Sequence, residues 1–367
     1  MLAYNRPMKK ILFYTDTPNI GGAEKQMLLL AKHLNQKGYE VSLAYGRYSK
    51  IKEMHSEFAQ WCKEVYVLPT IHKHDPRHYS RLKRILKNGN FNLIHLHLWN
   101  PGSCRYAFFA AHHYGIPIVT TEHDPFELTG IKLKIKQNCI KKTSQTIAVG
   151  SVNYKLLDEY YKIPENRLNL VHNGIEIDRF LDNANEPNLP IEQGDIVITC
   201  IAEIHPRKGH QYLLKAFRKL QLESPRVHLM LVGMGPLEYE LREKYADLPN
   251  VHFLGWRKDI VSILKASDIF ILPSLKEAFG LAVLEAMASG VIAIATNTGG
   301  TVDIIENGKN GYLIPPKDSD AIVRTIFNIL DNPDKKRQIE LAALERVQQE
   351  FTAEKMTKRT IEVYNNC

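Results

Sequence analysis

The chain has 367 residues, of which 44% are hydrophobic and 24% charged, a composition normal for a globular protein and a length sufficient for two domains. It contains no run of about eighteen apolar residues, and the short apolar run after Lys9 and Lys10 ends at Asp16, which excludes a membrane-spanning helix and argues against a signal peptide. Its five scattered cysteines show neither metal spacing nor a disulfide framework, so we expect reduced thiols in a cytoplasmic protein.

The net charge of +8 is spread unevenly along the chain. Residues 1–180 hold 26 Lys and Arg against 15 Asp and Glu, whereas the remaining residues hold 22 against 25. A basic half predicts an anionic partner, which leaves a membrane surface, a nucleic acid or a phosphorylated substrate open. Because the sequence contains no recognisable nucleic-acid-binding module, we expect no nucleic-acid partner.

Short apolar segments alternate with amphipathic ones through the first half of the chain. Strands are predicted at 10–15, 41–46, 65–69, 93–98, 117–122, 146–150 and 168–172. Helices are predicted between them at 24–34, 76–87, 104–114 and 152–161. This alternation is typical of a parallel sheet that is covered on both faces.

A second alternating set begins near residue 195. Its strands are predicted at 195–202, 227–233, 252–255, 268–273 and 291–296. The segment 182–195 is polar, contains two prolines and lacks an apolar period, so it is predicted to be a linker. We therefore expect two doubly wound α/β domains, over 1–181 and 196–349, and a last helix over 350–367.

In the first domain, a glycine pair follows the first predicted strand. Open parallel sheets bind ligands beyond the carboxyl ends of their strands. Gly21 and Gly22 open a helix at such a place, where the backbone can approach an anion at the helix N-terminus. The spacing is not the G-x-G-x-x-G of dinucleotide-binding folds, which argues against a hydride-transfer enzyme. A simple tight turn is the alternative.

Two turns of the second domain carry charged residues. Arg207 and Lys208 follow its first strand, where they could neutralise a diphosphate or form a solvated charge pair. The stretch KEAFGLAVLEAMASG (276–290) places Glu277 in a loop and Glu285 about two turns into a helix, with capping and solubility as the plain explanations. A phosphate could bind at the start of this helix, to the backbone N–H groups of Phe279, Gly280 and Leu281.

Two further patterns resemble metal sites. Asp318 and Asp320 form a D-x-D directly before a predicted helix, and we expect an N-cap there rather than a metal ligand. His95 and His97 share one face of a predicted strand but lack a third ligand at a recognisable spacing, which leaves packing or the lining of an acceptor site. We therefore expect no metal and no other cofactor.

The motifs occur together in the order of a known family. E-x7-E, GGAE (21–24), RKGH (207–210), VHNGIEIDRF (171–180) and GVIAIATNTGGTVDIIENGKNGYLIPPKD (290–318) resemble the retaining glycosyltransferases of family 4, group 1, which have the GT-B fold. The resemblance extends over nearly the whole chain. It implies two Rossmann-like domains facing a cleft, an acceptor-binding first domain, a donor-binding second domain and a last helix that returns to the first domain.

For the second domain, the resemblance implies roles around a nucleoside diphosphate sugar. Glu277 would bind hydroxyls of the transferred sugar, and Glu285 would bind the ribose. The diphosphate would be held by Lys208, Arg207 and the backbone of Gly280 and Leu281. The family usually has an arginine five positions before the lysine, but this sequence has Glu203 there. Either Arg207 supplies the missing charge or Glu203 points elsewhere.

For the first domain, the resemblance places further residues on the opposite side of the cleft. Gly21 and Gly22 would face the diphosphate or the acceptor. His123, which ends a predicted strand, matches the family histidine near the reacting side of the sugar. Asn173 and Gly174 match the turn that lines the base of the cleft near the hinge.

The resemblance also implies a reaction. We expect a metal-independent hexosyltransferase that retains the anomeric configuration and takes its sugar from a nucleoside diphosphate sugar, UDP being favoured over GDP. The acceptor would be a saccharide or a lipid-linked saccharide in cell-surface polysaccharide or lipopolysaccharide synthesis. A nucleotide-sugar 2-epimerase on the same fold and a non-catalytic nucleotide or sugar binder remain the alternatives.

Two basic segments of the first half point to a membrane surface. SRLKRILK (80–87) places apolar residues on one helical face with cations around them, and IKLKIKQNCIKK (131–142) is basic and partly amphipathic. Basic amphipathic segments bind anionic membranes, so we expect a cytoplasmic enzyme that associates peripherally with the membrane. A solvated helix face with a soluble acceptor is the alternative.

Overall fold

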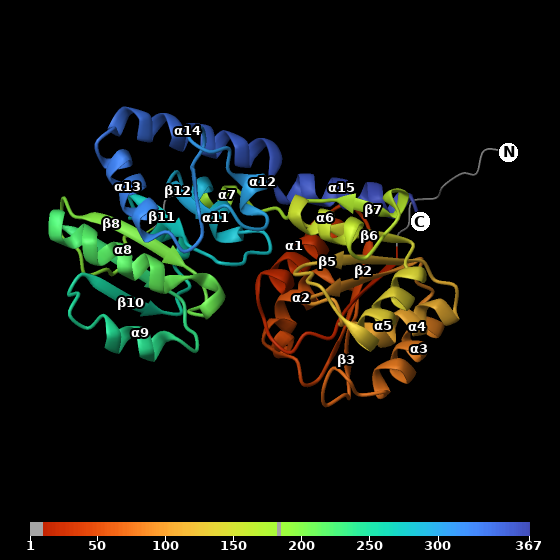
Figure 1. Ribbon diagram of the computed structural model, residues 1–367. Helices are drawn as coiled ribbons and strands as arrows, with labels where there is room; N and C mark the ends of the chain where they lie inside the picture. Colours follow the sequence, from red (N-terminus) through yellow and green to blue (C-terminus); the bar gives the residue numbers. More distant parts are fainter. Residues whose placement is uncertain (1–9, 182–184) are drawn as a thin grey trace. The chain divides into compact units, whose positions relative to one another are not determined.

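The computed structural model describes residues 10–181 and 185–367, which form two compact units. Unit 1 contains the chain up to Gly174 together with Ala353–Cys367, and unit 2 is Ile175–Thr352. The argument against a signal peptide concerns residues 1–9, which lie outside the described residues. Figure 1 shows the last helix, drawn in blue, among the red-to-yellow elements of unit 1.

Within the described residues, unit 1 is built on a seven-stranded parallel sheet of order β3-β2-β1-β4-β5-β6-β7. Its strands are β1 (Lys10–Thr15), β2 (Glu40–Gly46), β3 (Val65–Leu68), β4 (Leu93–Leu98), β5 (Ile118–Glu122), β6 (Gln145–Ala148) and β7 (Leu168–Leu170). The predicted strands of the first half are confirmed to within two residues at their ends. The order reverses between β1 and β4, which is where doubly wound sheets bind ligands.

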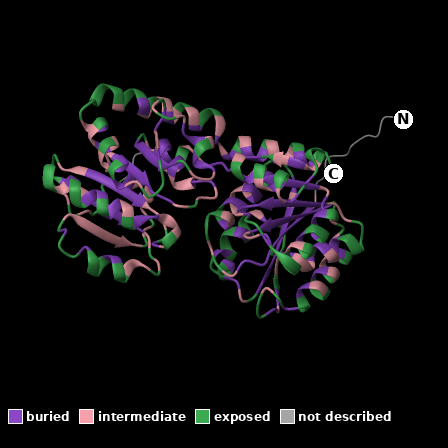
Figure 2. Cartoon of the chain, in the orientation of Figure 1, coloured by how far each residue is buried: buried purple, intermediate pink, exposed green. Residues whose placement is uncertain are grey.

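Helices cover both faces of this sheet because its strands are apolar on both sides. Ile11 and Phe13 of β1 pack in one core with α1, α2 and α15, whereas Leu12 and Tyr14 pack in another with α3 and α4. Figure 2 shows the strands of the sheet almost entirely buried. The helices are α1 (Gly22–Gln36), η1 (Lys50–Met54), α2 (His55–Trp61), α3 (Arg77–Gly89), α4 (Arg105–His113), α5 (Gly130–Lys141), α6 (Ser151–Glu159), η2 (Glu165–Arg167) and α15 (Ala353–Asn365).

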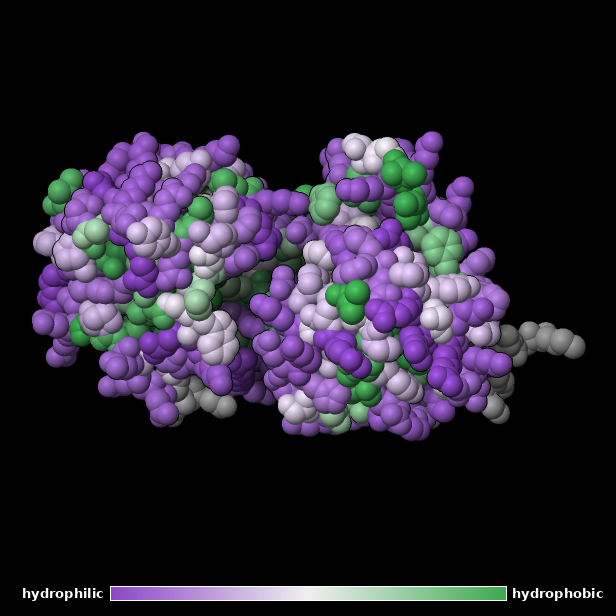
Figure 3. All heavy atoms as spheres, turned by 90° about the horizontal axis from the view of Figure 1, so that it is seen from below, coloured by the Kyte–Doolittle hydropathy of each residue, from purple (hydrophilic) through white to green (hydrophobic). Residues whose placement is uncertain are grey.

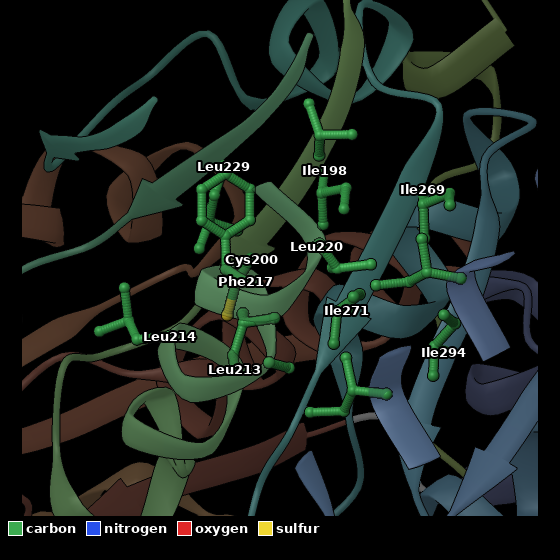
Figure 4. Packing of buried hydrophobic residues seen from close by; sticks show 14 of the residues in the cluster. Ile198, Cys200, Leu213, Leu214, Phe217, Leu220, Leu229, Ile269, Ile271 and Ile294 are labelled. Carbon is green, nitrogen blue, oxygen red and sulfur yellow. The ribbon is translucent and has the colours of Figure 1, made fainter. Parts of the chain in front are cut away.

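Unit 2 is a second doubly wound unit, with a six-stranded parallel sheet in its described residues, of order β10-β9-β8-β11-β12-β13. Figure 4 shows one of its cores, in which Ile198, Leu229 and Ile271 from the strands meet Leu213, Phe217 and Leu220 of α8. The strands are β8 (Ile196–Ile201), β9 (Val227–Val232), β10 (Val251–Gly255), β11 (Ile269–Leu272), β12 (Ile292–Thr296) and β13 (Tyr312–Ile314). The helices are α7 (Asp178–Leu181), η3 (Pro206–Lys208), α8 (His210–Glu223), α9 (Glu238–Lys244), α10 (Ile260–Lys265), α11 (Leu281–Ala288), α12 (Thr301–Ile304), α13 (Ser319–Leu330) and α14 (Pro333–Glu350).

The boundaries between the units differ from the predicted ones. The chain passes between units at Gly174 and at Thr352, rather than through 182–195. Ile175 pairs with Thr352, and α7 packs on α11, so the chain has already joined unit 2 before residue 182. Residues 182–184 lie outside the described residues, and 185–195 form neither helix nor strand. Asp195 forms an ion pair with Arg226 of unit 2, so the end of this segment is attached to that unit.

In the described part of the chain, no helix is long and apolar enough to cross a bilayer. Figure 3 shows one face of the molecule, where hydrophilic residues dominate and apolar residues gather only in small groups. The five cysteines, all within the described residues, form no disulfide.

Candidate active site

Two loops of unit 2 pack against each other at the carboxyl edge of its sheet. One follows β8 and contains Lys208; the other follows β11 and contains Glu277. The backbone N–H of Leu275 donates to the carbonyl oxygen of Arg207 at 2.7 Å. Gly209 has φ of 68°, and a Cβ on it would lie 2.0 Å from the carbonyl oxygen of Pro273, so only glycine allows this approach.

This packing brings together two residues that lie 69 positions apart. Lys208 Nζ donates to Glu277 Oε2 at 2.6 Å, and the Ser274 hydroxyl donates to the same oxygen at 3.0 Å. The side chains of Lys208 and Glu277 are only 12% and 9% exposed. Both hydrogen bonds are to Oε2, and no residue of the described chain bonds Oε1, which leaves that oxygen for a ligand hydroxyl.

A third loop, which follows β12, closes around Glu277. Gly299 has φ of 56°, and a Cβ there would lie 1.6 Å from the carbonyl oxygen of Glu277. The Thr296 hydroxyl donates to the Ser274 carbonyl at 2.5 Å. The loop that contains Glu277 continues directly into α11, whose N-cap is Gly280 and whose first residue is Leu281. Phe279 is buried beside this N-cap, with its ring 6.1 Å from that of Phe351.

Helix α11 carries the second carboxylate of the E-x7-E pattern. Glu285 is partly exposed and lies one turn after Leu281. The unpaired N–H groups at the start of a helix favour an anion. The structure therefore groups Lys208, Glu277 and the start of α11, as the sequence predicted, and adds Ser274, which carried no recognisable motif.

The departure at Glu203 has a structural counterpart. The Glu203 carboxylate lies 3.6 Å from Arg207 Nη2, one helical turn away in sequence, and both side chains are about half exposed. Glu203 therefore does not point away from Arg207, and its charge partly neutralises the guanidinium. Its electrostatic effect is modest because exposed ion pairs contribute little.

Two exposed apolar side chains at the same sheet edge were not predicted as site residues from the sequence. Met234 follows β9 and is 60% exposed, and Trp256 follows β10 and is 65% exposed. The backbone N–H of Gly233 donates to the carbonyl oxygen of Gly255 at 2.8 Å, so the two strand ends are adjacent. A tryptophan in solvent offers a stacking surface for a flat ring.

Unit 1 contains a buried group of three histidines. His97 Nδ1 and His123 Nε2 are 3.2 Å apart, and the two rings are stacked within 18° of parallel. Burial lowers the pKa of His123 to about 4 and of His95 to about 3, and holds that of His97 well below its usual value. All three rings are therefore neutral near pH 7.

The prediction that His95 lines an acceptor site is wrong. Its ring is fully buried, with Nδ1 bonded to the Tyr364 hydroxyl at 2.7 Å and Nε2 to the Thr121 hydroxyl at 2.8 Å. Tyr364 belongs to α15, so His95 helps to fix the last helix to the unit 1 sheet. His97 is also buried, and it contacts His123 rather than solvent.

The glycine pair and the Asn173–Gly174 turn are joined by one side chain. Gly21 is the N-cap of α1, and its N–H donates to Glu24 Oε2 at 2.8 Å. Gln26, one turn along α1, bonds both the carbonyl oxygen and the N–H of Gly174 at 2.9 and 3.2 Å. The glutamine thus fixes the turn at the end of β7 against the start of α1.

Aromatic and cationic side chains gather at the ends of β1 and β4. Asp16 Oδ1 accepts from the Trp99 indole at 3.0 Å, and burial raises the pKa of Asp16 to about 6. Lys73 Nζ lies 4.6 Å from the Trp99 ring centre, and the Tyr48 hydroxyl donates to the Asp16 carbonyl. Arg105 bonds His74 beside them. This edge has the polar and aromatic groups that bind sugars and anions.

The metal-like patterns have structural explanations. Asp318 is the N-cap of α13, where its Oδ1 accepts from the Ala321 N–H at 2.8 Å, and Asp320 pairs with Lys219. Among residues 10–181 and 185–367, no three His, Cys, Asp or Glu side chains are grouped so that they could hold a metal ion. The N-cap prediction is confirmed.

The chain folds into two doubly wound units, which is the GT-B class of glycosyltransferase folds. Unit 2 has a lysine–glutamate pair beside a helix start, and unit 1 has a buried histidine at a strand end. Family models match both parts: "Glycosyltransferase Family 4" over residues 20–179 and "Glycosyl transferases group 1" over residues 182–346. The chain belongs to glycosyltransferase family 4.

Known proteins similar to this chain support the same membership. The Escherichia coli UDP-Gal:alpha-D-GlcNAc-diphosphoundecaprenol alpha-1,3-galactosyltransferase is 28% identical, over 70% of this chain and 71% of its own. The Bacillus anthracis N-acetyl-alpha-D-glucosaminyl L-malate synthase is 26% identical over 97% of both. The crystal structure of Anabaena HepE in complex with UDP has a TM-score of 0.83 at 20% identity, over 98% of this chain and 100% of its own, so it shows the same fold.

Proposed function

We propose that the protein is a retaining hexosyltransferase that moves a sugar from a UDP-sugar to a saccharide or lipid-linked saccharide in cell-surface glycan synthesis. The observation that carries this proposal is the Lys208–Glu277 pair at the start of α11. It unites a cation for a diphosphate, a carboxylate for sugar hydroxyls and backbone donors for a phosphate. Glu285 on the same helix is the carboxylate for the ribose.

The proposed reaction proceeds on one face of the sugar. The bond between the anomeric carbon and the diphosphate oxygen breaks, a bond to the acceptor oxygen forms on the same face, and the acceptor proton goes to the departing diphosphate. Lys208, Arg207 and the start of α11 stabilise the charge that develops on the leaving group. His123, neutral because it is buried, orients the reacting sugar. We propose that no metal takes part.

UDP is favoured as the nucleotide on two grounds. HepE, which has the same fold, was crystallised with UDP, and the E. coli relative is named for a UDP-galactose donor. Met234 follows β9, the neighbour of β8, and Trp256 follows β10 on the other side of β9; both side chains are exposed and present an apolar surface for a base. We propose that the base stacks there while its diphosphate reaches Lys208.

The acceptor is proposed to be anionic. Lys73, Arg105 and Trp99 gather at the unit 1 sheet edge, and unit 1 carries the basic half of the chain. The E. coli and B. anthracis relatives are named for a diphosphate-linked and a dicarboxylate acceptor, respectively. A diphosphate-linked saccharide fits both the cations and the stacking surface.

The proposal is tested by measuring thermal unfolding with UDP, GDP, ADP, CMP and their common sugars. A ligand at a hundred times its dissociation constant adds about 2.7 kcal/mol to stability, so UDP should raise Tm clearly. Glu285→Ala should abolish that increase. If no nucleotide raises Tm, the donor site is absent. Consumption of UDP-sugar to an epimer without acceptor would identify an epimerase instead.

The membrane hypothesis now depends on α5 alone. Leu82 and Leu86 of α3 are buried in the unit 1 core, so the apolar face of 80–87 packs on protein and its predicted membrane role is wrong. On α5, Ile131 and Ile135 are 74% and 36% exposed. Exposed lysines at 132 and 134 flank them, and we propose that this surface binds anionic lipid.

We expect Ile131→Glu with Ile135→Glu to abolish co-sedimentation with phosphatidylglycerol vesicles at low salt. The substitution removes the apolar contact and adds charge repulsion. Leu341→Glu, at a site on unit 2 where the leucine is 63% exposed, is the control and should co-sediment like the wild type. Equal binding of all three proteins, or equal binding to neutral phosphatidylcholine, would contradict the proposed surface.

We expect Glu203→Gln to tighten UDP binding by up to about 5-fold, because an exposed ion pair contributes roughly 0.2–1 kcal/mol and the substitution removes a negative charge from beside Arg207. Isothermal titration with UDP and with uridine measures the effect. Uridine lacks the diphosphate, so its affinity should stay unchanged. Weaker UDP binding in this variant would show that Glu203 supports the site.

A further inference from the structure

A small cavity in unit 1 is lined in part by His97 and His123. Its volume is about 20 Å³. The polar residues that line it are Gln26, His97, Thr121, His123, Asn173 and Thr360. A cavity of about 10–15 Å³ is enough for one water molecule if polar partners are present, so this one fits a single water.

One nitrogen of the His97 ring has no hydrogen-bond partner among the described residues. His97 Nε2 is buried and bonds no residue of the described chain, whereas both nitrogens of the neighbouring His95 are bonded to hydroxyls. The His97 ring is fixed on its other side by His123 and by the edge of Phe13, whose ring centre is 4.8 Å away. A buried nitrogen in this position requires a hydrogen-bond partner, and a water would supply one.

The His97–His123 contact couples the protonation of the two rings. Both are neutral at pH 7, so one of the two facing nitrogens carries a proton and the other accepts it. If His97 Nδ1 donates, His123 carries its proton on Nδ1; if His97 accepts, His123 carries it on Nε2. The hydrogen bond of one ring nitrogen therefore decides what the other nitrogen offers to a substrate.

We propose that His97 is a positioning residue that fixes the ring orientation and tautomer of His123, and that one buried water bonded to His97 Nε2 completes the chain. This inference rests on the proposed function in giving His123 a role at the reacting sugar. This chain of hydrogen bonds runs from the water through His97 to His123. Phe13 and the β4 backbone hold the His97 ring in place. His97 itself contacts no substrate.

Three substitutions at one position separate positioning from packing. His97→Asn keeps an amide near the former Nδ1 and can still bond His123. His97→Gln places its amide near the former Nε2, and His97→Leu keeps only bulk. We expect kcat to fall about 100-fold in the Gln and Leu variants, as a misplaced reacting group does, and to stay within about tenfold in the Asn variant. The Tm increase with UDP should not change, because the residues proposed to bind UDP belong to unit 2.

If kcat falls in all three variants, and falls further the more Tm is lowered, the inference is overturned in favour of packing. Nitrogen-15 NMR of histidine-labelled protein gives a readout that needs no activity, with the His123 signals identified by their loss in His123→Gln. We expect one His123 tautomer in the wild type and in His97→Asn, and a mixture in His97→Leu. An unchanged tautomer in His97→Leu would also overturn it. If the tautomer responds as expected but the wild type transfers no sugar, the proposed function fails while the His97–His123 coupling stands.

Discussion

Replacing Lys208 by methionine is expected to lower kcat about 100-fold, because a cation that stabilises a leaving group contributes most in the transition state. Lys208 is 12% exposed and bonded to Glu277 at 2.6 Å, so its charge acts at low local dielectric. Steady-state kinetics with the UDP-sugar chosen by the thermal-shift experiment measures the change. The UDP affinity should fall too, by a smaller factor.

The control for this substitution must separate lost charge from lost structure. Lys215→Met removes an exposed lysine from α8 of the same unit and should leave kcat unchanged. Lys208→Met also leaves Glu277 without its partner, so Lys208→Met with Glu277→Gln is compared for Tm. A recovered Tm in the double variant shows that the Tm loss of Lys208→Met comes from the unpaired carboxylate, and a low kcat in Lys208→Met at a temperature well below its Tm is then assigned to the missing cation. Wild-type turnover in Lys208→Met would contradict the proposed stabilisation of the leaving diphosphate.

The sequence predicted most strands because parallel strands buried on both faces are continuous apolar runs. The segment ILFYT of β1 has no polar interruption, and each of its residues is buried in one of two cores or at the strand end. The missed strand β13, Tyr312–Ile314, has only three residues and is too short for a period. The unit boundary was misplaced because Ile175–Leu181 looks like a continuation of the first half, and only its pairing with Thr352 reveals otherwise.

The residues of the candidate site also fall into those that the sequence predicted and those that it did not. Charged and glycine residues at strand ends were predictable, because topology places all such ends on one edge. Lys208 and Glu277 confirm this, since their contact follows from β8 and β11 being neighbours. Contacts made by residues without a motif were not predictable. Ser274, Gln26 and Trp256 are single residues whose roles depend on packing.

Burial of a charge was the other property that sequence could not give. Helix α5 reads as a basic helix with its lysines in solvent, yet Lys136 is 3% exposed and forms an ion pair with Glu122, which is 2% exposed. Glu122 ends β5 directly before His123, and its other carboxylate oxygen, Oε2, is buried without a partner. Burial raises the pKa of Glu122 against the opposing effect of Lys136. The pair therefore holds α5 to the strand that carries His123.

Replacing Lys136 by methionine is expected to lower the free energy of unfolding by about 3–5 kcal/mol, because it leaves a buried carboxylate with no compensating charge. Urea unfolding of the full chain measures it. Lys134→Met, on the exposed side of the same helix, should change stability by less than about 0.5 kcal/mol. Glu122→Leu combined with Lys136→Met should restore most of the loss, because replacing a buried ion pair by apolar residues removes the desolvation penalty of both charges. A double variant as unstable as Lys136→Met would show that the pair contributes through geometry at the β5 end. An unchanged free energy of unfolding in Lys136→Met would show that water reaches Glu122.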